Sequence, residues 1–327
     1  MTHYETVTFT FLISDSNKLN IPLSFQFRDS SERERSTSSY NMAYIIYTID
    51  YIITIIINII TSPVTVLLNV LVIMAVIRRP RLQSYPNILL ACLAATDVFT
   101  GLITQPSFIV FRTFQFLGMS KSEIILEVSL GILSLCSLLH LMLITCDRLI
   151  AIKFTLRYPH IVTTRSIKVA VITVWIVSLI SGVFRPINNE TIKTFYNLSV
   201  TFIAIFCILF IVFSYLILYR EILRHQKKIQ TQQIPQEEVE RFAMEHKALK
   251  TTVFVVSAVL LCFVPGVFGI ALKTSGLVSS TSVLKPWIRT FLMLNSLLNP
   301  LIYCWRQKEM RKFAFRFERQ AHVPPAN

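Results

Sequence analysis

Seven long apolar runs dominate the chain and constrain its fold more than any other feature. They lie at roughly residues 51–77, 85–111, 124–152, 167–184, 198–219, 249–272 and 287–305. A helix crosses the hydrocarbon of a bilayer in about 20 residues, so each run is long enough to span it. Prolines lie inside four runs, and a helix bundle tolerates them because neighbouring helices can satisfy the freed carbonyl groups. We therefore expect an all-α membrane protein, a bundle of seven transmembrane helices.

The distribution of charge supports a membrane protein and sets its orientation. Of the 327 residues 53% are apolar and only 15% are charged, yet the net charge is +14. The Lys and Arg residues fall between the apolar runs, which is typical of loops on an anionic membrane leaflet and not of a nucleic-acid-binding face. Twenty-one of the 32 lie in one set of gaps. Since cytoplasmic loops are the richer in Lys and Arg, that side is expected in the cytoplasm and the N-terminus outside the plasma membrane.

Three regions follow from this pattern. We expect residues 1–45 to be a disordered extracellular tail, residues 46–305 to be the bundle, and residues 306–327 to form an amphipathic cytoplasmic helix and a short tail. Residues 40–50 lack a hydrophilic turn and are interpreted as an outward extension of the first helix. The sequons at Asn189 and Asn197 fall between the fourth and fifth runs, on the expected outer face, and are candidate glycosylation sites. All six cysteines lie inside the runs, so no extracellular disulfide is expected.

Isolated polar residues inside the apolar runs are candidates for function, because an ionisable side chain at membrane depth is costly. One carboxylate and several hydroxyl and amide groups stand at comparable depth in runs one, two, three and seven: Asn69, Asp97, Ser137, Asn295, Ser296 and Asn299. Such oxygen donors suit a small hard cation such as Na⁺, or a proton. A hydrogen-bonded network that only holds the helices together explains the same residues, and spacing does not decide between the two.

The inner end of the third run carries the pair Asp147-Arg148. An arginine there can extend harmlessly to the interface. Alternatively, Glu245 at the inner start of the sixth run could pair with Arg148 and form a latch across the bundle. Tyr215 and Tyr303 lie near the same end and could receive Arg148 when it is released.

The outer end of the third run carries Glu123 and Glu127 on one helical face. Two like charges one turn apart require a cation, a basic ligand or free solvent. A solvated helix end is the plain interpretation, and a ligand vestibule that also includes Phe268 and Arg289 is the functional one.

These landmarks together resemble the rhodopsin-like (class A) G-protein-coupled receptors over about residues 50–317. The resemblance rests on Asn69 in LNVLV, the LAATD run ending at Asp97, Asp147-Arg148-Leu149, Trp175, Tyr215, the CFVP run 262–265 and the NPLIY run 299–303. Any one is weak, but all seven in this order and spacing are specific.

The resemblance implies a role for most of the residues above. Asp97 and its polar neighbours match the family's allosteric sodium pocket, and Arg148 matches the arginine that engages the G protein, with Glu245 as its resting partner. Tyr215 and Tyr303 match tyrosines that rearrange on activation, while Phe263, Pro265 and Pro300 lie in the switch motifs of helices six and seven. The implied function is activation of a heterotrimeric G protein by an extracellular ligand, through outward movement of helix six.

The chain also departs from the usual family pattern. Glu123 stands where the helix-three cysteine of the common disulfide would be, Cys207 replaces the helix-five proline, and Phe263 replaces a tryptophan. The missing disulfide, the missing helix-five proline and a short second outer loop together look like the melanocortin/lipid/cannabinoid/adenosine branch. Melanocortin receptors bind Ca²⁺ through acidic residues at the positions of Glu123 and Glu127, but their third ligand corresponds to Ser107 here, which leaves a calcium site open.

Two other positions exclude particular classes of ligand. Leu130 stands where amine receptors carry an acid, and Met293 where opsins carry the retinal lysine, so a typical monoamine and retinal are not expected. The ligand, a peptide or small molecule, is otherwise unknown. No Ser or Thr follows Asn299, so we expect weak arrestin recruitment. No enzyme activity is expected; the alternatives are a non-signalling seven-helix binding protein or, less favoured, a transporter.

Overall fold

The computed structural model describes residues 30–119, 123–154, 157–184, 189–231, 254, 257–269 and 284–306. The expected amphipathic cytoplasmic helix lies outside the described residues, apart from residue 306, as do Glu245 and the side chain of Tyr303. All the regular elements among the described residues are helices.

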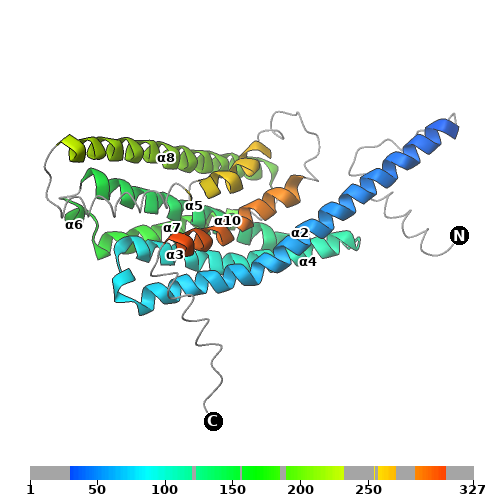
Figure 1. Cartoon of the computed structure of the whole chain (residues 1–327). Helices are drawn as coiled ribbons and strands as arrows, with labels where there is room; N and C mark the ends of the chain where they lie inside the picture. Colours follow the sequence, from blue (N-terminus) through cyan, green and yellow to red (C-terminus); the bar gives the residue numbers. More distant parts are fainter. Residues whose placement is uncertain are drawn as a thin grey trace, which may run out of the picture.

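Long apolar helices run side by side through the molecule (Figure 1). They are α2 (Ser30–Arg78), α3 (Tyr85–Phe99) continuing through η2 (Thr100–Thr104) into α4 (Gln105–Phe116), α5 (Ile124–Lys153), α7 (Thr164–Phe184), α8 (Glu190–Thr231), Ser257–Gly269 and α10 (Leu284–Arg306). Short helices η1 (Pro80–Leu82) and α6 (Tyr158–Ile161) lie in the connections. Five segments are long and apolar enough to cross a membrane by length and composition. Ser257–Gly269 and α10 bring the described helical segments of the bundle to seven, as the sequence predicts.

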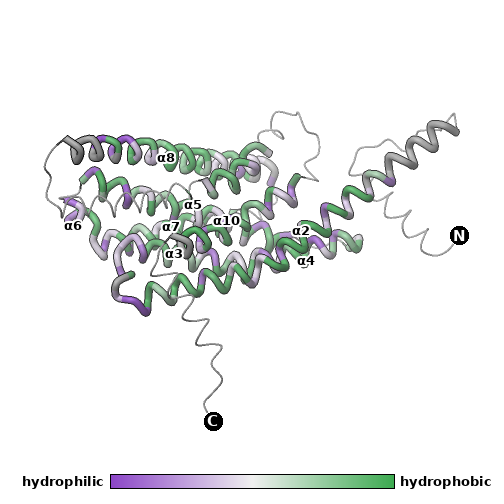
Figure 2. Tube along the Cα trace, viewed as in Figure 1, coloured by the Kyte–Doolittle hydropathy of each residue, from purple (hydrophilic) through white to green (hydrophobic). Residues whose placement is uncertain are grey.

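Apolar residues line the helices along most of their length, and hydrophilic residues gather at the α2–α3 turn and around α6 (Figure 2). A main core joins residues of α2, α3, α5, α8 and Ser257–Gly269, among them Leu89, Leu138 and Leu218. A smaller cluster of Phe108, Leu126, Leu130 and Met293 lies nearer the other end. Many large apolar side chains remain exposed, as expected for helices whose outer faces contact lipid.

Helix α2 is longer than the sequence analysis indicates. Its 49 residues begin at Ser30 and include residues 40–50, so part of the expected tail, residues 30–45, is helical. At 1.5 Å per residue the helix is about 74 Å long, more than twice the thickness of the hydrocarbon region. Figure 1 shows its N-terminal half extending beyond the other helices. Hydropathy indicates only the part of a helix that lies in lipid, so the apolar pattern does not predict the polar N-terminal part of α2.

The second transmembrane segment contains a π-helical turn, η2, that the apolar pattern does not reveal. Pro106 follows it and has no backbone N–H, so the regular ladder of hydrogen bonds is interrupted there. Gly101 lies within η2, and its carbonyl oxygen accepts a hydrogen bond of 2.8 Å from the Ser62 hydroxyl of α2. The missing side chain of Gly101 lets the two backbones approach closely at this point.

Candidate functional site

A buried polar centre lies between α2, α3, α5 and α10. Asn299 donates a hydrogen bond of 2.9 Å to Asp97 Oδ2, and Asn295 donates one of 3.2 Å to Ser137 Oγ. Asn69 Nδ2 reaches the backbone carbonyl of Ser296 at 3.0 Å. The structure therefore brings together all six polar residues that the sequence places at this depth, and each is at most 3% exposed.

Three acceptor oxygens in this centre have no hydrogen-bond partner among the described residues: Oδ1 of Asp97, Asn295 and Asn299. A cavity of about 10 Å³ lies beside one of the three, Asn295, and is also lined by Ser137, Ser296 and Phe263, among others. That volume is about the least that can hold one water molecule. Unpaired buried acceptors beside a small cavity suit a hydrated cation or a water, because an unsatisfied buried oxygen is costly.

Two of the three residues expected to act as a switch, Phe263 and Pro300, adjoin this centre. Phe263 is 6% exposed and lines the same small cavity from helix Ser257–Gly269. Pro265 is half-buried in that helix, and Pro300 is buried inside α10 directly after Asn299. A proline after the asparagine removes one backbone donor, which makes α10 easier to bend next to the polar centre.

Asp147 and Arg148 lie at one end of α5 and pair with each other at 3.1 Å. Asp147 also accepts a hydrogen bond of 2.8 Å from the hydroxyl of Tyr158 in α6. Burial, and then this hydrogen bond to Asp147, raise the pKa of Tyr158 far above its usual range, so the hydroxyl stays protonated and can donate. Tyr158 was not among the predicted site residues, although its position beside Pro159 in the connection after the Asp147-Arg148 pair was a usable signal.

The described residues contain only part of the expected latch. Glu245 lies outside them, so the predicted pairing of Arg148 with Glu245 stays a prediction. Tyr215 is buried in α8 at 8% exposure. The Asp147–Arg148 pair and Tyr158 therefore make up the described part of this end of the site.

Four charged side chains meet at the opposite end of α5, where it faces α10. Arg289 Nη2 lies 2.7 Å from Glu123 and 3.1 Å from Glu127. Lys285 Nζ lies 3.1 Å from Glu123 and 3.6 Å from Glu127. The Arg289 guanidinium also stacks 5.6 Å from the ring of Phe111. The two half-buried glutamates thus pair with cations of the protein itself and are not simply a solvated helix end.

Electrostatics stabilise the ionised form of Glu123. Burial alone would raise the pKa of this carboxyl, but the nearby charges and hydrogen bonds of Arg289 and Lys285 outweigh burial and hold it below its usual range. Lys285 was not predicted, although its spacing of four residues from Arg289 matches that of the two glutamates. Phe268 is 62% exposed, and no described contact joins it to the cluster.

The calcium hypothesis gains no support from this arrangement. The two glutamates already pair with two cations, which Ca²⁺ would have to displace. Among the described residues, no group of three His, Cys, Asp or Glu side chains is placed to hold a metal ion.

A second, buried ion pair joins α2 to α4 and was not predicted. Arg112 Nη2 lies 2.6 Å from Asp50 Oδ2, and the two side chains are 2% and 6% exposed. The Arg112 guanidinium also lies 5.7 Å from the ring centre of Tyr47 and 5.9 Å from that of Tyr51. Sequence alone could not pair these residues, because they are 62 positions apart.

The two candidate glycosylation sites occupy different local structures. Asn189 is exposed and precedes α8, where its Oδ1 accepts hydrogen bonds from the backbone N–H groups of Thr191 and Ile192. It is therefore an N-cap of α8. Asn197, which we expected in the loop, lies within α8, because this helix begins at Glu190 and not near residue 198. Its side chain is exposed.

Membrane-length helices packed around a buried carboxylate, with an Asp-Arg pair at one end and a charged cluster at the other, define a polytopic membrane protein of the receptor type. The chain belongs to the rhodopsin family of seven-transmembrane receptors: the family described as 7 transmembrane receptor (rhodopsin family) matches residues 68–303. Proteins of this family are receptors and not enzymes.

Several curated receptors resemble the chain at low identity. The histamine H2 receptor of Cavia porcellus is 28% identical, covering 74% of this chain and 72% of its own length. The human melanocortin receptor 3 is 24% identical, covering 74% of this chain and 78% of its own. The adenosine receptor A2a of Cavia porcellus is 25% identical, covering 78% of this chain and 69% of its own. The expected likeness to melanocortin and adenosine receptors is confirmed.

Proposed function

We propose that the chain is a plasma-membrane receptor, with its N-terminus outside the cell, that converts binding of an extracellular ligand into activation of a heterotrimeric G protein. The observation that carries this proposal is the Asp147–Arg148 pair, held by Tyr158 at one end of the bundle in a protein of the rhodopsin family. Arg148 is 22% exposed and so lies at the surface of that end. Outward movement of helix Ser257–Gly269 would open the site next to Arg148.

Ligand-free G-protein activation in cells tests this proposal. Wild type is compared with Arg148→Ala, Glu245→Ala and the control Lys168→Ala, which removes an exposed charge from α7. Signalling should rise in Glu245→Ala, vanish in Arg148→Ala and stay unchanged in Lys168→Ala, at matched surface expression. Background signal from all four receptors would remove support for the latch and favour a binding protein that does not signal.

We further propose that Na⁺ binds at the polar centre. The three unpartnered oxygens of Asp97, Asn295 and Asn299 support this, together with the small cavity that Asn295 lines. The purified protein should unfold at a higher temperature in NaCl than in the chloride of a bulky organic cation. Asp97→Asn should abolish that difference, because it removes the only carboxylate of the centre. An equal response of wild type and Asp97→Asn to sodium would exclude this site.

The ligand class is a separate question. The relatives are named for histamine, melanocortin and adenosine, three chemically different ligands, so their names do not select one. We propose that the ligand carries at least one charged group that enters the cluster of Glu123, Glu127, Lys285 and Arg289. A neutral ligand would leave those ion pairs intact and gain little from them.

The composition of the C-terminal residues supports a proposal about arrestin recruitment. Arrestin recruitment through the C-terminal residues should be weak, since no Ser or Thr follows Asn299 to accept a phosphate. A strong arrestin signal that is lost when the residues after 306 are deleted would contradict it.

A further inference from the structure

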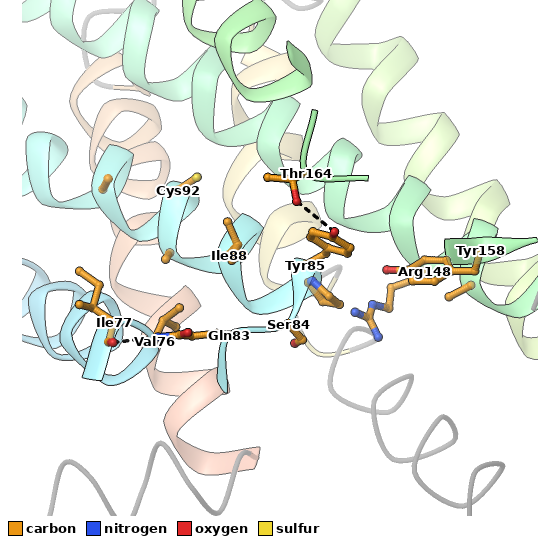
Figure 3. A pocket seen from close by; sticks show the side chains of 14 residues that line it. Val76, Ile77, Gln83, Ser84, Tyr85, Ile88, Cys92, Arg148, Tyr158 and Thr164 are labelled. Carbon is orange, nitrogen blue, oxygen red and sulfur yellow. Dashed lines mark hydrogen bonds between the residues drawn. The ribbon is translucent and has the colours of Figure 1, made fainter. Parts of the chain in front are cut away.

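A large cavity opens at the Arg148 end of the bundle, on the side of α2, α3 and α7. Its volume is about 1060 Å³, which far exceeds the small cavity beside the polar centre. Figure 3 shows the Arg148 guanidinium pointing into it between Tyr85 and Tyr158. Tyr85 and Thr164 are joined across the cavity wall by a hydrogen bond of 3.1 Å between their hydroxyls.

The lining of this cavity is divided into two parts. Hydroxyl and guanidinium groups come from Ser84, Tyr85, Arg148, Tyr158 and Thr164. The amide of Gln83 lies apart from them, beside Val76 and Ile77 (Figure 3). The apolar part of the lining comes from α2 and α3 and includes Val76, Ile88, Ala91 and Ala95. A ligand that fills the cavity must therefore be amphipathic.

The charge around the cavity is positive. Arg148 lines it, and exposed arginines adjoin lining residues in the chain: Arg78 follows Ile77, Arg157 precedes Tyr158 and Arg165 follows Thr164. The described lining contains no acidic residue. Asp147, the nearest acid in the sequence, is 4% exposed and already holds Tyr158 and Arg148. The cavity therefore favours an anion as the polar part of a ligand, which would share Arg148 with Asp147.

We propose that this cavity binds the phosphorylated headgroup of an anionic membrane lipid. The phosphates would pair with Arg148 and accept hydrogen bonds from the hydroxyls of Tyr85 and Ser84, since guanidinium groups bind phosphate strongly and directionally. The glycerol and first acyl carbons would contact the apolar wall of α2 and α3. Arginines flanking the cavity add attraction to an anionic leaflet.

This binding would also regulate the receptor. A phosphate on Arg148 occupies the side chain that we propose for G-protein contact, so the bound lipid favours the resting state. This consequence rests on the proposed function, whereas the binding itself does not. Lipid binding can therefore be measured on the purified protein with no G protein present.

Native mass spectrometry of the full chain in mild detergent provides the test. Three probes are titrated: dioctanoyl phosphatidylinositol bisphosphate, its free headgroup inositol trisphosphate, and dioctanoyl phosphatidylcholine. We expect one saturable phosphoinositide per chain, bound about tenfold more tightly than phosphatidylcholine or the free headgroup, because the anionic group and the apolar wall both contribute. Equal binding of phosphatidylcholine, or of the free headgroup, would overturn the proposal.

Variants locate the binding. Arg148→Gln removes the cation and Ala91→Phe fills the apolar side, and each should weaken phosphoinositide binding about tenfold. The double variant Arg157→Gln/Arg165→Gln changes only exposed side chains, so it should fold normally and weaken binding several-fold. Arg224→Gln is the control, because Arg224 is 76% exposed on α8, which contributes nothing to the lining. Unchanged affinity in both the rim variant and Arg148→Gln would place the lipid elsewhere.

Discussion

The buried Asp50–Arg112 pair allows the sharpest prediction about stability. Both side chains are almost fully buried, and the 2.6 Å contact joins α2 to α4. Arg112→Ala leaves the Asp50 carboxylate buried without its partner, and removing one member of such a pair costs about 3–5 kcal/mol. At about 2 °C per kcal/mol for a protein of this size, the unfolding midpoint should fall by roughly 6–10 °C.

Two comparison variants separate the charge effect from loss of packing. Asp50→Asn/Arg112→Gln removes both charges and keeps polar side chains at both positions, although Gln is shorter than Arg. It should recover most of the loss because no buried charge is left unpaired. Arg224→Ala breaks an exposed pair with Glu221, whose side chains are 76% and 34% exposed, and should lower the midpoint by less than about 2 °C.

The assay is thermal unfolding of the purified protein in detergent, followed by tryptophan fluorescence. Each variant is first checked for a single monodisperse peak. The reasoning is refuted if Arg112→Ala unfolds within a degree or two of Arg224→Ala. It also fails if the double variant is as unstable as Arg112→Ala, since the loss would then come from the contacts of Arg112 with Tyr47 and Tyr51.

Three further predictions concern single positions. The ion pairs of Glu123 lower its pKa, so they stabilise the folded protein fully above about pH 4.3, and this stabilisation is lost as the pH falls through the lowered pKa. Glu123→Gln should therefore flatten the dependence of the unfolding midpoint on pH in that acidic range. A methyl group at Gly101 would lie 2.7 Å from Val66 Cγ2 and 3.1 Å from the Ser62 carbonyl, so Gly101→Ala should destabilise by about 1–3 kcal/mol. Gly266→Ala, whose nearest neighbour is at 3.5 Å, should melt close to wild type. Asn189→Asp should retain the helix cap, and Asn189→Ala should lose about 1 kcal/mol. Both should show a smaller glycosidase-sensitive gel shift than wild type, because the sequon at Asn197 remains.

The polar centre could be predicted from the sequence because its residues are few and conspicuous. Asp97 and Asn299 each stand in a mainly apolar run, and the membrane favours the burial of both side chains. Their direct contact is a property of how α3 and α10 pack. The spacing within each helix fixes which residues share a face, whereas the rotation and tilt between helices decide which faces meet.

Contacts near the helix ends could not be predicted for a related reason. Water can satisfy a charge at the end of a membrane helix, so Asp50, Glu127 and Arg112 are compatible with either solvation or pairing. Hydropathy also does not mark where a helix begins outside the lipid, and α8 consequently starts eight residues before the apolar run that predicts it. The η2 turn depends on Pro106 together with the close approach of α2, and the second of these is a tertiary property.

Ion pairs, and no disulfide among the described residues, join the Glu123 end of α5 to α10. The cysteines that the structure describes are all free, while Glu123, at the position of the usual helix-three cysteine, pairs with Arg289 of α10. A disulfide would hold α5 irrespective of the ligand, whereas ion pairs can exchange partners. A charged ligand that takes Arg289 or Lys285 must displace Glu123 and so loosens α5 from α10 as it binds. Because a ligand shifts the receptor only by its differential affinity for two states, this exchange gives a charged ligand a direct means of favouring the separated state.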